Sequence, residues 1–275
     1  MNNIQVWLIK RTRAASYLSS IKRCRKAQLI FILSGFTLFS FSQNSDSTKP
    51  VSRFAAVVTL TSKGISTIPN LTLGKPAVLF DLAMGRKLTF EPQFRFALEG
   101  KPWTFIFWGR YKLLQTGKFA MSMGAHPAFS FRTMQDTIDG VSKEIIAVNR
   151  YLAGELSPVF LFTESFGIGL YYLYSYGIDK DATNNTHLLA FRVNFLNIKL
   201  SRQFFMWFNP QVYYLNMDEK EGFYFNATAG LSIKNFPLSV SALVNKSIQT
   251  EIPAKDDFLW NVSLVYTFNR QYIEK

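Results

Sequence analysis

Eight titratable residues of the chain stand between apolar residues or glycine: Glu91, Arg95, Glu99, Arg110, Lys112, His126, Glu155 and Arg192. If such side chains gather on one inner surface, they can line a constriction that selects solutes by charge. They can equally pair with one another and hold the surrounding strands together. Both alternatives stay open from the residue types alone, and both need elements that turn these side chains to one face.

Two further basic residues share a sequence context. Lys75 lies in Gly74-Lys75-Pro76, and Lys101 lies in Gly100-Lys101-Pro102. Each motif stands at the head of an expected strand, so we expect both lysines on the same outer rim, where they could attract anionic solutes or lipopolysaccharide phosphates. The plainer interpretation is turn chemistry, because Gly supplies a positive φ and Pro can begin a strand.

The elements that position these residues are indicated by hydrophobicity that alternates with period two from about residue 53 almost to the C-terminus. This period is typical of strands with one apolar face. Along residues 88–98, Phe90, Phe94 and Phe96 alternate with Glu91 and Arg95. We expect about twelve strands, within a range of 10 to 14, at about residues 53–65, 76–85, 87–98, 102–114, 118–132, 143–162, 165–178, 187–200, 203–215, 222–234, 237–249 and 258–268.

The same alternation assigns faces to individual residues. In the strand at residues 102–114, Trp103 and Phe105 fall on the apolar face, and Trp108 and Arg110 fall on the opposite face. Arg150 is an exception, because this register places it on the apolar face. A bulge or a position near a membrane interface would accommodate it.

The expected connectors alternate between tight and longer ones. The tight connectors are residues 86–87, 115–117, 163–164, 201–202 and 235–237, and the longer ones are 66–75, 133–142, 179–186, 216–221 and 250–257, with 99–101 as a short exception. Most acidic residues fall in the longer set. Short periplasmic turns and longer surface loops are typical of outer-membrane barrels, and an even strand number puts both termini in the periplasm.

The N-terminal region predicts export. Seven Lys and Arg residues between Lys10 and Lys26 precede an uncharged apolar run from Leu29 to Phe41. This order matches a signal peptide, and an apolar run of about 13 residues is too short to span a bilayer as a helix. We expect a signal peptide at residues 1–43, a short periplasmic tail at 44–52, a barrel at 53–269 and a C-terminal tail at 270–275.

Composition supports one membrane barrel. Removal of the leader leaves 24 basic and 18 acidic residues, a net charge of about +6 that is scattered and does not indicate nucleic-acid binding. Cys24 lies in the leader, so the mature chain would have no disulfide. Aromatic residues make up 16% of the chain, more than a soluble β-sandwich needs. The expected fold is an all-β, transmembrane, antiparallel up-and-down β-barrel.

Two stretches carry a resemblance to a known family. They are TSKGISTIPNLTLGKPAVLFDLAMG at Thr61 to Gly85 and LTFEPQFRFALEGKPWTFIFWGRYKLL at Leu88 to Leu114. They resemble the uncharacterised outer-membrane β-barrel proteins of Bacteroidota, and the likeness extends weakly through GAHPAFSF at Gly124 to Phe131. The resemblance implies a location in the outer membrane and no particular activity.

The sequence predicts no catalytic or metal site. An outer-membrane barrel phospholipase uses a His, a Ser two residues on and an Asn further along, whereas His126 is followed at that spacing by Ala128. The two histidines, His126 and His187, lack a metal-ligand spacing. Asp179 and Asp181 form a lone D-x-D that could hold Ca²⁺ but is more typical of a solvated loop. We expect no enzyme activity and no cofactor.

Two functions fit this reading. A porin-like channel for small solutes is favoured slightly because the inner face is polar, and a closed structural or surface-interaction barrel is the alternative. The expected partners are outer-membrane lipid, lipopolysaccharide, the barrel-assembly machinery and small solutes, with no nucleic acid. The expected location is the outer membrane of a Gram-negative bacterium.

Overall fold

A computed structural model describes residues 51–138, 141–254 and 256–273. Within these ranges the chain forms one short 3-10 helix and twelve strands. They are β1 (Val51–Thr61), η2 (Pro69–Leu71), β2 (Ala77–Gly85), β3 (Leu88–Ala97), β4 (Pro102–Thr116), β5 (Phe119–Ile138), β6 (Val141–Leu161), β7 (Phe166–Gly177), β8 (Asn185–Lys199), β9 (Phe204–Met217), β10 (Lys220–Ile233), β11 (Leu238–Thr250) and β12 (Phe258–Ile273). The predicted signal peptide lies outside the described residues.

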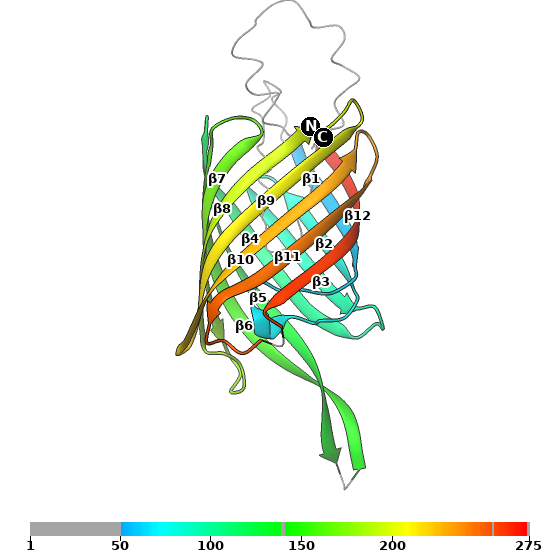
Figure 1. The fold of residues 1–275 in the computed structure, drawn as a ribbon, viewed down its shortest axis with the longest axis vertical. Coiled ribbons are helices and arrows are strands. Elements are labelled where there is room, and N and C mark those ends of the chain that lie inside the picture. The colour runs from blue at the N-terminus through cyan, green and yellow to red at the C-terminus, as the bar shows by residue number, and fades with distance from the viewer. Residues whose placement is uncertain (1–50, 139–140, 255, 274–275) are drawn as a thin grey trace, which may run out of the picture.

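The strands form a closed antiparallel barrel (Figure 1). Each strand pairs with its neighbours in sequence, and β1 also pairs with β12, from Val51 opposite Ile273 to Thr61 opposite Ser263. Closure pairs the backbone groups around the whole barrel, which a β-sheet in hydrocarbon requires. The predicted all-β up-and-down barrel of twelve strands is confirmed.

Large apolar side chains cover the outside of the barrel. On β12, Trp260, Val262 and Leu264 are exposed, whereas Asn261 and Ser263 between them are buried. Exposed apolar side chains recur on all twelve strands. A continuous band of this kind fits lipid and not water, so these strands span a membrane. No helix in the described part of the chain is long and apolar enough to cross a membrane.

Two segments expected as loops are mostly strand. Residues 133–142 continue the β5–β6 hairpin, which pairs out to Ile138 and Val141 and projects beyond the barrel (Figure 1). Residues 216–221 form the ends of β9 and β10, joined by a two-residue turn in which Asp218 adopts a φ of 54°. Polar residues do not end these strands because a hairpin outside the membrane can expose them to water on both faces.

A β-bulge overturns the predicted face of Trp103. Arg95 pairs with Thr104, but Phe96 pairs with Pro102, so Trp103 is an extra residue on β4. Its ring is buried inside the barrel, and its Nε1 donates a hydrogen bond to the Leu71 carbonyl oxygen (2.8 Å). The bulge turns Trp103 inward, whereas strict alternation would place it in lipid.

The inside of the barrel contains a hydrophobic core. Its buried members come from β4, β6 to β10 and the β11–β12 loop: Trp108, Ala153, Tyr171, Leu173, Leu188, Ala190, Tyr213, Leu215, Met217, Tyr224 and Ile252. The expected polar inner face is found on other stretches, for example at Asn226 and Thr228. The interior is therefore partly a packed apolar core and only partly a polar lining.

Candidate functional site

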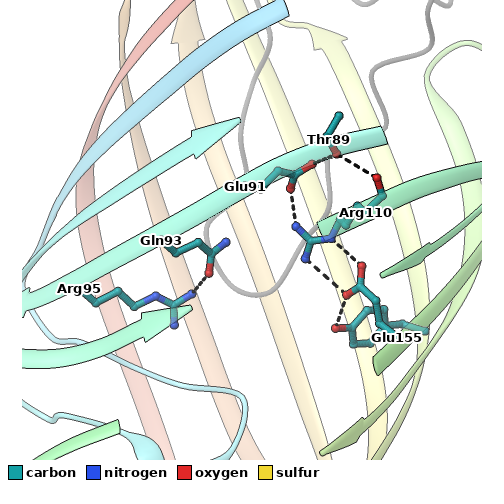
Figure 2. Close-up of polar contacts among 7 residues, drawn as sticks. Thr89, Glu91, Gln93, Arg95, Arg110 and Glu155 are labelled. Carbon is teal, nitrogen blue, oxygen red and sulfur yellow. Dashed lines mark hydrogen bonds and ion pairs between the residues drawn. The ribbon is translucent and has the colours of Figure 1, made fainter. Parts of the chain in front are cut away.

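Arg110 is the centre of an ion cluster inside the barrel. Alternation along β3, β4 and β6 turns Glu91, Arg110 and Glu155 inward (Figure 2). Arg110 Nε donates to Glu155 Oε1 (2.6 Å), and its Nη1 forms an ion pair with Glu91 Oε2. One guanidinium thus joins two carboxylates from different strands.

Gly124 on β5 leaves room for this cluster. It lies between Arg110 and Glu155 in the strand pairing. A Cβ atom at Gly124 would lie 2.9 Å from Arg110 Cγ and 3.1 Å from Glu155 Oε1. Both contacts are too close, so glycine is the residue that lets the arginine reach across β5.

Neighbouring groups hold both carboxylates in place. Tyr171 Oη donates to Glu155 Oε2 (2.8 Å), and Thr89 Oγ1 donates to Glu91 Oε1 (2.7 Å). The Arg110 guanidinium also lies 4.0 Å from the centre of the Trp108 ring, a cation–π geometry. A buried ion pair is stable only when such additional contacts satisfy its groups, and this one has them.

Two more arginines predicted to face inward do so. Arg192 lies over the Tyr171 ring at 3.8 Å and donates from Nε to Gln211 Oε1 (3.2 Å). Arg95 donates from Nη2 to Gln93 Oε1 (3.0 Å), apart from the Arg110 cluster (Figure 2). The structure therefore brings Arg192 close to the cluster through Tyr171 and leaves Arg95 separate.

Of the other predicted lumen residues, two face inward and one does not. His126 is buried with its ring 4.0 Å from that of Trp108, and Lys112 is half-buried opposite the buried Ser122. The prediction for Glu99 is wrong. β3 ends at Ala97, so alternation no longer applies, and Glu99 lies in the exposed turn that follows.

The two rim lysines lie at the loop end of the barrel as expected, and each is paired with a carboxylate at the surface. Lys75 Nζ lies 3.4 Å from Glu99 Oε1, and Lys101 Nζ lies 2.5 Å from Glu144 Oε1. The hydrogen bond from Lys101 to Glu144 raises the pKa of Lys101. An anion at these lysines would compete with Glu99 and Glu144.

Residues 62–76, here named the cap, fold into the mouth of the barrel and include η2. Tyr213 Oη on β9 donates to the Thr67 carbonyl (3.0 Å), and Asn261 Nδ2 on β12 donates to the Lys63 carbonyl (2.8 Å). With Trp103 on β4 bonded to Leu71, the cap is attached to three separate strands. It therefore lies across the mouth.

A cavity of about 130 Å³ lies beneath the cap. Its walls combine cap residues with inward side chains of β3 to β9. They include Ile65, Ile68, Leu71, Arg95, Trp103, Thr104, Ile106, Trp108 and His126. Sequence patterning missed the cap and Trp103. The signal that could have indicated a filled interior is the placement of Trp108, Tyr171, Tyr213 and Tyr224 at inward positions of the alternation.

Among the described residues, no group of His, Cys, Asp and Glu is arranged to hold a metal ion. Asp179, a candidate Ca²⁺ ligand from its D-x-D spacing, instead accepts hydrogen bonds from Arg150 Nη2 (2.6 Å to Oδ1) and from the Arg150 backbone N–H (2.6 Å to Oδ2). Arg150 thus lies level with the end of β7, where the β5–β6 hairpin leaves the barrel, near the edge of the membrane band, which accommodates its position on the outer face.

The Asp179–Arg150 pair predicts a pH effect on the β7–β8 loop. The hydrogen bonds from Arg150 lower the pKa of Asp179. Because this pKa is lower in the folded state than in the unfolded chain, the pair stabilises the loop fully at pH values above the unfolded-state pKa of Asp179. The stabilisation is lost as the pH falls through the lowered folded-state pKa. Asp179→Asn should reduce amide-exchange protection at Ala182 by about threefold at pH 7, and the difference should vanish near pH 2. A difference independent of pH would contradict this.

No family model matches the chain, and no curated protein matches it. Among solved structures, the chain is similar to the KdgM porin in complex with disordered oligogalacturonate (10% identity, TM-score 0.46, 78% of this chain and 99% of that chain). It is also similar to LpxR from Salmonella typhimurium (10% identity, TM-score 0.45, 78% and 99%) and to the beta domain of the Bordetella autotransporter BrkA (9% identity, TM-score 0.45, 79% and 98%). None is similar enough for its activity to be carried over.

Proposed function

We propose that the chain is an outer-membrane β-barrel that is closed to solutes at rest and encloses a small-molecule cavity beneath its cap. The observation that carries the proposal is the attachment of the cap to β4, β9 and β12 through Trp103, Tyr213 and Asn261. β4 and β9 are on nearly opposite sides of a twelve-strand circle. A segment bonded to both crosses the mouth.

The interior below the cap supports the same proposal. The apolar core joins six strands and the β11–β12 loop, and Arg110 is held between Glu91 and Glu155. Charges in an aqueous constriction would be hydrated, whereas Arg110 and Glu155 are buried. The inward charges therefore support a barrel whose strands are held together by paired charges more than they support a permanently open channel.

Location and orientation belong to the proposal. The apolar band fits a bilayer, and a closed barrel pairs every backbone N–H and C=O group of its strands within the hydrocarbon. The start of β1 pairs with the end of β12, so the first and last residues of the barrel lie on the same side of the membrane. We assign this side to the periplasm. The cap then faces the cell surface. Lipopolysaccharide, the barrel-assembly machinery, the kinship with Bacteroidota barrels and the lack of enzyme activity stay predictions.

Cysteine labelling on intact cells tests the closed cap and its orientation. Lys75→Cys lies on the exposed rim and Ile65→Cys lies in the buried cavity wall, and the chain's own Cys24 is in the predicted signal peptide. A membrane-impermeant maleimide should label Lys75→Cys at least about tenfold faster, because a buried thiol is shielded. Equal labelling rates would contradict a closed cap, and no labelling of Lys75→Cys would contradict the orientation.

A further inference from the structure

The walls of the cavity beneath the cap are largely apolar. Ile65, Ile68 and Leu71 contribute from the cap, and Trp103 and Ile106 contribute from β4. Its volume of about 130 Å³ is close to the roughly 150 Å³ of an engineered apolar cavity that binds benzene. The apolar part of a ligand in this cavity is therefore limited to about one six-membered ring.

Three polar atoms in the cavity wall lack a partner within the described residues: Arg95 Nε, Thr104 Oγ1 and His126 Nδ1. Thr104 and His126 are both more than nine-tenths buried. Buried polar atoms in folded proteins are nearly always hydrogen-bonded, so these three atoms are available to bond to water or to a ligand in the cavity. Arg95 and Thr104 are also direct partners across β3 and β4, so their side chains leave the sheet next to each other on the inner face.

The charge of Arg95 is balanced differently from that of Arg110. Arg110 is engaged by two carboxylates, whereas the hydrogen bond of Arg95 in the described structure goes to the neutral Gln93. Asp81 on β2 faces inward opposite Gln93 on β3. Its two carboxylate oxygens have no hydrogen-bond partner among the described residues, and Asp81 is not part of the cavity wall. Arg95 thus interacts electrostatically with the Asp81 carboxylate, but no carboxylate of the described residues forms a hydrogen bond with it.

We propose that the cavity binds a small organic anion, a carboxylate carried on an aromatic or branched aliphatic body. Arg95 and Thr104 receive the carboxylate, because a guanidinium and a hydroxyl can both donate to it. Trp103 and Ile106 contact the apolar body. This inference rests on the proposed function, since it needs the cavity to be enclosed by the cap.

Calorimetric titration of the purified protein with sodium benzoate tests the proposal, with benzyl alcohol as the neutral analogue. Benzoate should bind at least about tenfold more tightly than benzyl alcohol, since one hydrogen bond to a charged group accounts for that factor. Arg95→Gln should weaken benzoate binding by about tenfold or more and leave binding of benzyl alcohol unchanged.

Matched variants keep the test decisive. Arg202→Gln changes an exposed arginine in the β8–β9 turn and should bind benzoate like the wild type. If Arg95→Gln does not fold, as judged by heat-modifiable migration on a gel, Thr104→Val should still weaken benzoate binding several-fold. Equal affinity for acid and alcohol, no effect of these variants, or no binding of benzoate would overturn the inference. Cysteine labelling reports separately on the closed cap, so a failure of anion binding can be told apart from a failure of the closed barrel.

Discussion

Replacing Arg110 by leucine should lower the free energy of unfolding by about 3–5 kcal/mol. The substitution removes the cation that Glu91 and Glu155 share, and it leaves two carboxylates inside the barrel without their counter-charge. Glu155 is fully shielded from solvent, so water cannot replace the lost partner. Unfolding by guanidinium from lipid vesicles, followed by tryptophan fluorescence, measures the change.

Two controls separate the ion cluster from a general effect of losing an arginine. Arg202→Leu, at an exposed turn, should change stability by less than about 0.5 kcal/mol. Adding Glu91→Gln and Glu155→Gln to Arg110→Leu should recover much of the loss, because neutral amides need no counter-charge. Wild-type stability in Arg110→Leu would mean that the cluster does not hold the barrel together.

Enlarging Gly230 should have the second large effect. A Cβ atom at this residue would lie 2.1 Å from Cζ2 of Trp207, and the Trp207 side chain is almost completely buried. The ring is shielded from solvent on nearly all sides, so Gly230→Leu should destabilise the barrel by about 3 kcal/mol or prevent folding, the upper range for overpacking. The same unfolding titration measures it.

Ala229 provides the matched control for this prediction. It is the neighbour of Gly230 on β10, and alternation turns it to the outer face, where it is partly exposed. Ala229→Leu adds the same bulk toward lipid and should be tolerated within about 0.5 kcal/mol. Equal effects of the two substitutions would contradict a packed interior around Trp207.

The barrel itself could be predicted because its information is local. Alternation requires only that neighbouring residues face opposite sides, and it placed Glu91, Arg95, Arg110, Glu155 and Arg192 on the inner face correctly. The pairing of Arg110 with both Glu91 and Glu155 was not predictable. It depends on the stagger between strands and on the missing side chain at Gly124, which alternation does not describe.

The cap and the bulge escaped prediction for a different reason. The cap is held by side chains far away in sequence, such as Tyr213 and Asn261, bonding to its backbone carbonyls. A backbone carbonyl carries no residue-specific signal. Trp103 turned inward because β4 has one residue more than β3 at that point, and Glu99 left the inner face because its strand had already ended. Both errors arise where side chains no longer alternate regularly between the two faces of the sheet.

Single-channel recording in planar bilayers tests the closed barrel most directly. The protein, inserted at high load and verified by heat-modifiable migration, should give no discrete conductance steps at moderate voltage, because the cap and the buried cluster around Arg110 block the lumen. Discrete steps of uniform size from the wild-type protein would contradict the closed barrel and restore the open channel.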